Sequence, residues 1–387
     1  EYILYRAERT RIREMNTRLM KVFEGLTFKD AIDNDLKREN ANINGDTAMG
    51  TMLRYGQESA KQFYELFILN PAHSNAHKNG DIHIHDLGFL TLTTTCCQID
   101  IERLLKGGFC TGHGYLREPK DIQSYAALAC IAIQSNQNDQ HGGQSIPNFD
   151  YGMAEGVAKT YTKIYRQNLI NSIELITGSG EFEEAILEMF KKIEEEHSSR
   201  PSLNMMNTNE MYKKLEVRYL EEIIKDKDVI ARAQDFTMKR ALTETKRRTY
   251  QAMEALIHNL NTMHSRAGAQ IPFSSINYGM DTSPEGRLVV ESVLLATEAG
   301  LGNGETPIFP IQIFKVKEGI NYNKEDPNYD LFKLACRVSA KRLFPNFSFV
   351  DAPYNLKYYK PGHPETEVAY MGCRTRVMGN VYDRPTM

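Results

Sequence analysis

Histidines gather in one short stretch of the chain. Four of them and an aspartate fall between His73 and Asp86, and His83 and His85 are separated by one residue. On a strand, residues two apart point to the same face, so two imidazoles at this spacing could bind one metal ion. A catalytic metal would need further ligands, and the later His258 falls inside a charged helical segment. We therefore expect ordinary hydrogen-bonded histidines, with a metal pair and a substrate-contact role as alternatives.

The cysteines offer a second kind of chemistry, because a thiolate is a nucleophile and a metal ligand. Cys96 and Cys97 are adjacent at the end of a predicted strand, so only one of them can point into a given cavity. Cys373 stands in the segment MGCRTR, between polar loops. No Cys-x-x-Cys occurs, which excludes a zinc ribbon and a thioredoxin-type pair. The other cysteines are expected to be buried and inert: Cys110, Cys130 and Cys336.

Three glycine clusters lie at residues 107–114, 142–143 and 300–304. None is followed by the Lys-Ser/Thr of a phosphate-binding loop. The last one precedes a predicted strand, whereas a dinucleotide fingerprint must precede a helix. We expect the clusters to be turns in which two backbone segments pass close to each other.

The elements that would position these residues are helices first and then strands separated by long helical stretches. Apolar spacing predicts helices over residues 1–16, 51–69, 125–133, 182–197, 211–262 (two helices separated near 225–228) and 329–343. A polar loop is expected at 40–50, and extended structure at 80–100, 271–278 and 308–316. The order favours an α/β sheet or barrel, because nearly continuous apolar strands are typical of a parallel sheet covered by helices.

The composition is that of a globular protein. The 387 residues carry 47 basic and 50 acidic side chains, a net charge of −3, which argues against a general nucleic-acid or membrane-surface binder. No apolar run is long enough for a membrane helix. Six cysteines are too few for a disulfide scaffold in a chain of this length, so we expect free thiols and a cytoplasmic location.

Several motifs together resemble the anaerobic (class III) ribonucleoside-triphosphate reductases, a family of glycyl radical enzymes. They occur in the family's order and cover nearly the whole chain: GDIHIHD (80–86), TCCQID (95–100), NGETPIFP (303–310), DPNYD (326–330), AKRLFP (340–345) and MGCRT (371–375).

The resemblance implies that ribonucleoside 5′-triphosphates are reduced to 2′-deoxyribonucleoside triphosphates, for DNA precursor synthesis. It assigns two catalytic cysteines. Cys373 would receive the radical at the tip of a finger loop and abstract the 3′-hydrogen of the ribose. Cys96, rather than Cys97, would face it from the first barrel strand and supply hydrogen at the 2′ position.

The resemblance also implies the architecture, a ten-stranded α/β barrel made of two five-stranded halves. Residues 1–79 would form a helical region following an ATP cone, and residues 80–387 the first half-barrel with the finger loop around Cys373. The second half-barrel, the radical glycine and a C-terminal zinc site have no counterpart in the sequence given, so we expect a fragment of a longer protein.

The partners follow from the same resemblance. We expect a homodimer, ATP and deoxynucleotide effectors, and an iron–sulfur activase that uses S-adenosylmethionine. Glu118 and Lys120, shortly after the Gly-rich turn, could bind an effector, with surface charge as the alternative. The reductant would be formate or a thioredoxin-like dithiol, and no direct contact with nucleic acid or membrane is expected.

Two other functions are weighed against the reductase. One is a metal-dependent barrel hydrolase that uses His83 and His85. The other is a non-catalytic homologue that binds deoxynucleotides and only senses or regulates.

Overall fold

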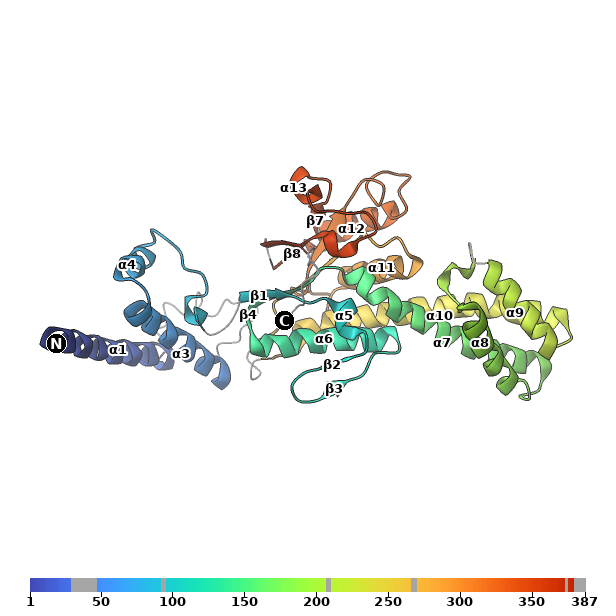
Figure 1. The fold of residues 1–387 in the computed structure, drawn as a ribbon, viewed down its shortest axis with the longest axis horizontal. Coiled ribbons are helices and arrows are strands. Elements are labelled where there is room, and N and C mark those ends of the chain that lie inside the picture. The colour runs from blue at the N-terminus through green and yellow to red at the C-terminus, as the bar shows by residue number, and fades with distance from the viewer. Residues whose placement is uncertain (29–46, 92–94, 207–209, 266–269, 373–374, 379–387) are drawn as a thin grey trace. The chain divides into compact units, whose positions relative to one another are not determined.

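The computed structural model describes residues 1–28, 47–91, 95–206, 210–265, 270–372 and 375–378 (Figure 1). The chain forms two compact units. Unit 1 contains Glu1–Cys97, Ile133–Gln144 and Asn261–Phe273, and unit 2 contains Gln98–Ala132, Ser145–Leu260 and Ser274–Met387. The predicted boundary between residues 79 and 80 rests on motifs rather than on compactness, and stays a prediction.

Unit 1 begins with a pair of helices. The predicted helix at 1–16 is confirmed as α1 (Tyr2–Phe28), which is longer than expected and buries none of its residues, so its mixed-charge face is solvated. It packs along α3 (Ala48–Phe63), which continues as the π-helical turn η1 (Tyr64–Ile68) (Figure 1). The edge of the Phe23 ring meets Tyr55, with centroids 5.6 Å apart. The predicted loop at 40–50 falls largely outside the described residues, and its last residues already belong to α3.

The dipeptide Asn70-Pro71 both ends one helix and starts the next. Asn70 accepts a hydrogen bond from the amide of Ala72, and Pro71 occupies the first turn of α4 (Pro71–Asn79), where a missing N–H costs nothing. Gly80 closes α4 in the left-handed conformation that glycine adopts without strain.

The prediction of extended structure over 80–100 is wrong for most of that segment. Residues 80–91 form turns and the short 3₁₀ helix η2 (Leu87–Phe89), and only β1 (Thr95–Gln98) is a strand. A segment with alternating side chains forms a strand only where a neighbouring strand binds its backbone N–H and carbonyl groups. In addition, Asp86 at φ 51° turns the chain away from extended geometry. His83 and His85 therefore do not lie on a strand.

The main sheet has the order β1-β4-β5-β6-β7. Its other strands are β4 (His141–Ile146), β5 (Ser274–Tyr278), β6 (Ile311–Val316) and β7 (Asn346–Phe349). Within unit 2, β5 pairs parallel with β6 (Ser275 opposite Ile311), and β6 with β7 (Ile313 opposite Asn346). Every residue of β5 is buried, as expected for a strand covered on both faces. The predicted α/β class is confirmed. The glycines at 142–143, predicted to form a turn, lie in β4 instead.

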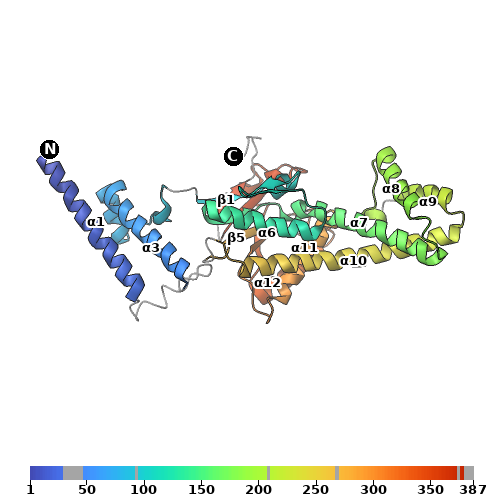
Figure 2. The same ribbon diagram turned by 90° about the horizontal axis from the view of Figure 1, so that it is seen from below.

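Helices of 4 to 36 residues accompany the strands of unit 2. They are α5 (Ile101–Leu105), α6 (Ile122–Asp139), α7 (Phe149–Thr177), α8 (Glu183–His197), α9 (Glu210–Ile223), α10 (Lys227–Thr262), α11 (Pro284–Ala299), α12 (Tyr329–Arg342) and α13 (Pro353–Leu356). The predicted interruption near 225–228 is confirmed between α9 and α10. Within this unit α7 and α10 run side by side toward α8 and α9 (Figures 1 and 2), and the hydroxyls of Ser172 and Thr237 meet at 3.2 Å between them.

The core of unit 2 fixes the strands against these helices. Helix α7 packs on β5 and α11, and α12 packs on β6. The ring of Phe314 on β6 contacts Tyr278, Phe332 and Phe347 at centroid separations of 5.9, 6.1 and 6.1 Å. Burying one such ring contributes about 1.5–3 kcal/mol. The sheet is therefore a firm support for groups attached to it.

Smaller elements complete the chain. Two antiparallel hairpins are formed by β2 (Phe109–Cys110) with β3 (Tyr115–Leu116) and by β8 (Val368–Met371) with β9 (Thr375–Met378), and two 3₁₀ turns are η3 (Leu203–Met206) and η4 (Pro364–Thr366). Within the described part of the chain, no helix combines the length and apolarity needed to cross a bilayer.

Candidate active site

The two adjacent thiols of β1 have different surroundings. The Cys96 sulfur accepts a hydrogen bond from the backbone amide of Gly143 on β4 (3.2 Å), and the Cys97 sulfur accepts one from the Asn136 side chain on α6 (2.9 Å). Burial raises the pKa of the Cys97 thiol, which favours its protonated form. Which thiol faces a substrate stays a prediction.

The backbone at Cys96 is strained. Its φ of 65° lies in the left-handed region, which side chains other than glycine rarely adopt. Such strain costs about 1–3 kcal/mol and is concentrated at functional sites. Cys96 is thus one of the few described non-glycine residues with positive φ, and its neighbour Cys97 is not among them.

The second predicted catalytic residue, Cys373, lies outside the described residues. The strands on either side of it in the sequence are described: β8 and β9 pair antiparallel, with Met371 opposite Thr375. The finger loop stays a prediction, and what the structure describes there is the β8–β9 hairpin. Its first strand lies against β5 within unit 2.

The histidines form a local cluster around Asp86. His141, at the start of β4, lies 3.0 Å from the Asp86 carboxylate and stacks on the Phe89 ring at 3.8 Å. The exposed His85 approaches the other Asp86 oxygen at 3.7 Å. His83 makes only ring contacts in the structure, with centroids 5.6 Å from His85. Among the described residues no group of three or more His, Cys, Asp or Glu side chains is arranged to hold a metal.

Three cysteines were expected to be buried and inert, and the expectation holds for one. Cys130 is buried on α6, and burial raises its pKa to about 12. Cys110 and Cys336 are exposed, because the first lies on a two-stranded hairpin without a covering layer and the second on the outer face of α12.

A buried ion pair that the sequence analysis missed lies beside the hairpin. Lys315 on β6 is fully buried, and its ammonium donates to Glu367 and to Asn148, each at 2.8 Å. The Tyr151 hydroxyl donates to the other Glu367 oxygen at 3.1 Å. Glu367 directly precedes β8, so this network fixes the base of the hairpin to the sheet. A lysine inside an otherwise apolar strand was the available signal.

Asp150, also missed, holds the loop that follows β5. Its carboxylate accepts hydrogen bonds from three successive backbone amides, those of Gly279, Met280 and Asp281, at 2.8, 3.0 and 3.1 Å. Burial, and then the charge of Asp150, raise the pKa of the Asp281 carboxyl to about 6. The N-terminal turn of α7 is thereby fixed to the end of β5.

Glu118 and Lys120, the two residues predicted to bind an effector, differ in their hydrogen bonds within the protein. Both carboxylate oxygens of Glu118 accept hydrogen bonds, one from the Lys159 ammonium and one from the Gly107 amide, and the Lys159 contact lowers the pKa of Glu118. Lys120 is exposed. Glu118 therefore fixes the Gly-rich turn to α7, while Lys120 is accessible to a ligand.

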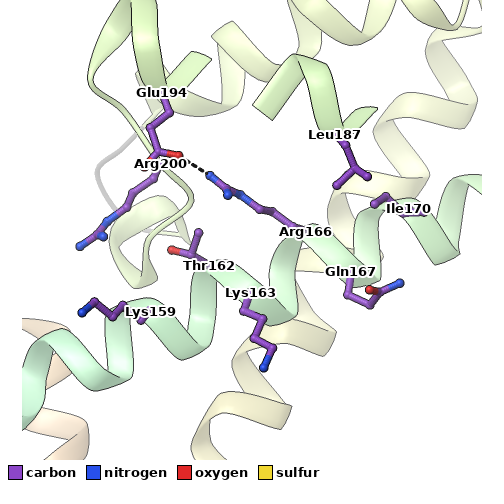
Figure 3. Close-up of a pocket in the computed structure, with 9 residues that line it drawn as sticks. All are labelled: Lys159, Thr162, Lys163, Arg166, Gln167, Ile170, Leu187, Glu194 and Arg200. Carbon is purple, nitrogen blue, oxygen red and sulfur yellow. Dashed lines mark hydrogen bonds and ion pairs between the residues drawn. The ribbon is translucent and has the colours of Figure 1, made fainter. Parts of the chain in front are cut away.

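A pocket of about 350 Å³ lies in unit 2 (Figure 3), and Lys159 in its lining donates a hydrogen bond to Glu118. It is lined by Lys159, Thr162, Lys163, Arg166, Gln167 and Ile170 of α7, Leu187 and Glu194 of α8, and Arg200. Its four basic side chains all have acidic partners, namely Glu118, Asp121, Glu194 and Glu155. An anionic ligand would have to compete with these ion pairs.

The family model described as anaerobic ribonucleoside-triphosphate reductase matches residues 39–386. The chain belongs to this family. The match includes both predicted catalytic cysteines and all six motifs.

Curated relatives agree with the family. Anaerobic ribonucleoside-triphosphate reductase of Escherichia coli K12 is 28% identical over 377 residues, which is 97% of this chain and 43% of that protein. The reductase of phage T4 is 27% identical over 92% of this chain and 48% of its own length. The chain thus spans less than half the length of these curated relatives.

Solved structures of anaerobic ribonucleotide reductases are also similar. That of Thermotoga maritima in complex with dATP and CTP aligns with a TM-score of 0.48 and 10% identity, covering 90% of this chain and 50% of that one. Another, with dATP bound in the specificity site, aligns with a TM-score of 0.46.

Proposed function

We propose that this protein is an oxidoreductase that works under anaerobic conditions. It reduces ribonucleoside 5′-triphosphates to 2′-deoxyribonucleoside triphosphates by thiyl and glycyl radical chemistry. The family match over residues 39–386 carries this proposal. The hydrolase alternative lacks support, because His83 and His85 are not on a strand and the described residues offer no metal cluster.

The proposed chemistry divides between two thiols. Cys373 would become a thiyl radical by giving its hydrogen atom to a glycyl radical, which lies on a glycine outside these 387 residues. Cys373 takes the 3′-hydrogen of the ribose, which weakens the bond to the 2′-hydroxyl. The 2′-hydroxyl leaves as water with a proton from the solvent, and Cys96 gives its one hydrogen to the 2′ position. Formate or a dithiol protein provides the two electrons of the overall reduction, and the 3′-hydrogen then returns from Cys373.

The domain organisation is part of the same proposal. Residues 80–387 form the first half of a ten-stranded barrel, and residues 1–79 a helical region that follows an ATP cone. A second half-barrel, a zinc site and the radical glycine belong to polypeptide outside the sequence given. The parallel strands β5, β6 and β7 support the barrel assignment.

Partners and effectors are proposed on family grounds. They are an iron–sulfur activase that uses S-adenosylmethionine, a second copy of the chain, ATP and deoxynucleotides, all in the cytoplasm. At the effector site Lys120 would contact phosphate, and Glu118 would hold the turn beside it. Calorimetric titration with dATP should show weaker binding for Lys120→Ala than for Lys341→Ala, which removes an exposed lysine on α12.

The function is tested on the full-length protein, activated without oxygen by its activase and S-adenosylmethionine. Conversion of CTP to dCTP is measured together with the glycyl radical signal in electron paramagnetic resonance. We expect Cys96→Ala and Cys373→Ala to form the radical but no product, because each removes a thiol that reacts with the ribose. Cys336→Ala, at an exposed thiol of α12, is the matched control and should retain activity.

Each alternative gives its own result. Stoichiometric metal that is lost on His83→Ala and His85→Ala would favour the hydrolase. Deoxynucleotide binding without any radical after activation would favour the non-catalytic homologue. Normal dCTP formation by Cys96→Ala, with loss in Cys97→Ala, would move the 2′ role to the neighbouring thiol.

A further inference from the structure

The inner strand β5 presents two polar side chains to β8 and Gly372, which precede Cys373 in the sequence. Ser275 and Asn277 are two residues apart, so they share one face of the strand, and both are fully buried. Buried polar side chains are expensive unless their hydrogen bonds are satisfied. What these two side chains bind therefore shows what they are for.

The amide of Asn277 binds the main chain of Tyr370 on β8 at two points. Its oxygen accepts from the Tyr370 N–H at 2.8 Å, and its nitrogen donates to the Tyr370 carbonyl at 2.9 Å. The Ser145 hydroxyl donates to the same carbonyl at 2.9 Å. A neighbouring strand would satisfy the N–H and carbonyl of one residue in this way, so Asn277 replaces a rung of a β-ladder with a side chain.

Ser275 makes a second contact with this segment, two residues farther along. Its hydroxyl oxygen accepts from the backbone N–H of Gly372 at 3.2 Å. Two residues along β5 span about 6.6 Å, and the atoms bound, at Tyr370 and Gly372, are also two residues apart. The matching spacing means that the hairpin is held in one register on β5. Gly372, at φ 57°, directly precedes Cys373 in the sequence.

The base of the hairpin is held by the buried pair of Lys315 and Glu367, three residues before Tyr370. The chain leading to Cys373 is therefore held at Glu367, Tyr370 and Gly372, each by a side chain from a strand of the sheet. The register of the last few residues before Cys373 depends on Asn277 and Ser275, because the ion pair lies farther back.

We infer that Asn277, assisted by Ser275, is a positioning residue that fixes the register of the chain up to Gly372, directly before Cys373 in the sequence. The inference rests on the proposed function for its catalytic meaning. Reactions between positioned groups are sensitive to placement, and a shift of about 1 Å can cost roughly 100-fold in rate. Neither side chain is required to touch the ribose for this effect.

The test compares two buried asparagines in the full-length protein. Asn277→Ala removes the two-point contact, and Asn355→Ala removes a buried amide that donates to the Phe349 carbonyl (2.7 Å) and not to the hairpin. Hydrogen exchange of the peptide covering 368–372 should become faster in the first variant and remain unchanged in the second. Equal exchange in both variants would overturn the inference.

Turnover then tests the catalytic meaning. For Asn277→Ala we expect a normal glycyl radical signal, a KM for CTP close to that of the parent, and kcat lower by roughly 100-fold. Ser275→Ala, a milder change that removes the Gly372 contact, should lower kcat less and serves if the first variant folds poorly. A kcat that falls equally in Asn355→Ala would show a merely structural role.

The two proposals fail in different ways. Faster exchange in Asn277→Ala, in a parent protein that never reduces CTP, would support the docking of the hairpin and refute the reductase. An active parent with unchanged exchange and unchanged kcat in Asn277→Ala would refute the positioning role and leave the reductase intact.

Discussion

Glu216 on α9 should make the stability of the protein depend on pH. Its side chain is fully buried between helices, where the Tyr165 hydroxyl and the Gln234 amide each donate to one carboxylate oxygen at 2.7 Å. Burial, opposed in part by these hydrogen bonds, raises the pKa of Glu216 from 4.5 to about 7. An exposed glutamate in the unfolded chain ionises near its ordinary pKa.

The sign and size of the effect follow from this difference. Between the two pKa values the folded state holds a proton that the unfolded state has released, so stability is greatest at low pH and falls as pH rises toward 7. Each unit of difference corresponds to about 1.4 kcal/mol, which gives about 3 kcal/mol in total and about 2–3 kcal/mol between pH 5 and pH 8. Above pH 8 the contribution of Glu216 should be constant.

The perturbation is Glu216→Gln, which keeps an acceptor for Tyr165 but cannot ionise. Urea denaturation gives the free energy of unfolding of variant and parent at pH 5 and pH 8, and subtracting the two cancels the titration of all other groups. The variant should gain about 2–3 kcal/mol relative to the parent on going to pH 8. Glu221→Gln, at an exposed position on the same helix, is the control and should show no such gain. A difference between Glu216→Gln and the parent that is the same at both pH values would refute the reasoning.

Two further predictions concern packing and buried charge. Gly152→Ala on α7 should lower the free energy of unfolding by about 1–3 kcal/mol, because the new methyl group would collide with Ile101. Gly56→Ala on α3 has open space and should instead be neutral or stabilising, so thermal denaturation of the pair isolates the collision. Glu367→Gln should destabilise the protein by about 3–5 kcal/mol, because it leaves the fully buried Lys315 ammonium without its carboxylate. Denaturant titration would contradict this if the double variant with Lys315→Met were no more stable than Glu367→Gln alone.

Local patterns in the sequence predicted several helices, but no helix was expected at α7 or α11. The interruption near 225–228 and the end of α12 before Phe344-Pro345 depend on residues within one or two turns, and both are where the structure has them. The prediction of extended structure at 80–100 was wrong because alternating side chains alone do not make a strand. A strand also needs a neighbouring strand to bind its backbone N–H and carbonyl groups, and at residues 80–91 the chain turns instead.

The contacts that define the candidate site could not be predicted from the sequence. Lys315 binds a carboxylate 52 residues away, and Asp150 binds amides about 130 residues away. A lysine in an apolar strand and an aspartate in the first turn of a helix signal that a partner exists, but do not identify it. The family resemblance located Cys96 and Cys373 without showing what holds them.

The bonds from β5 to the hairpin have a consequence for how its sequence can vary. Asn277 and Ser275 bind main-chain atoms of Tyr370 and Gly372, and no side chain of the hairpin takes part in these bonds. Any residue other than proline offers the same N–H and carbonyl at position 370. Mutational tolerance is therefore unequal on the two sides of the contact. Non-proline substitutions at position 370 leave these hydrogen bonds in place. No other side chain offers one donor and one acceptor at the same distance from the backbone as Asn277 does.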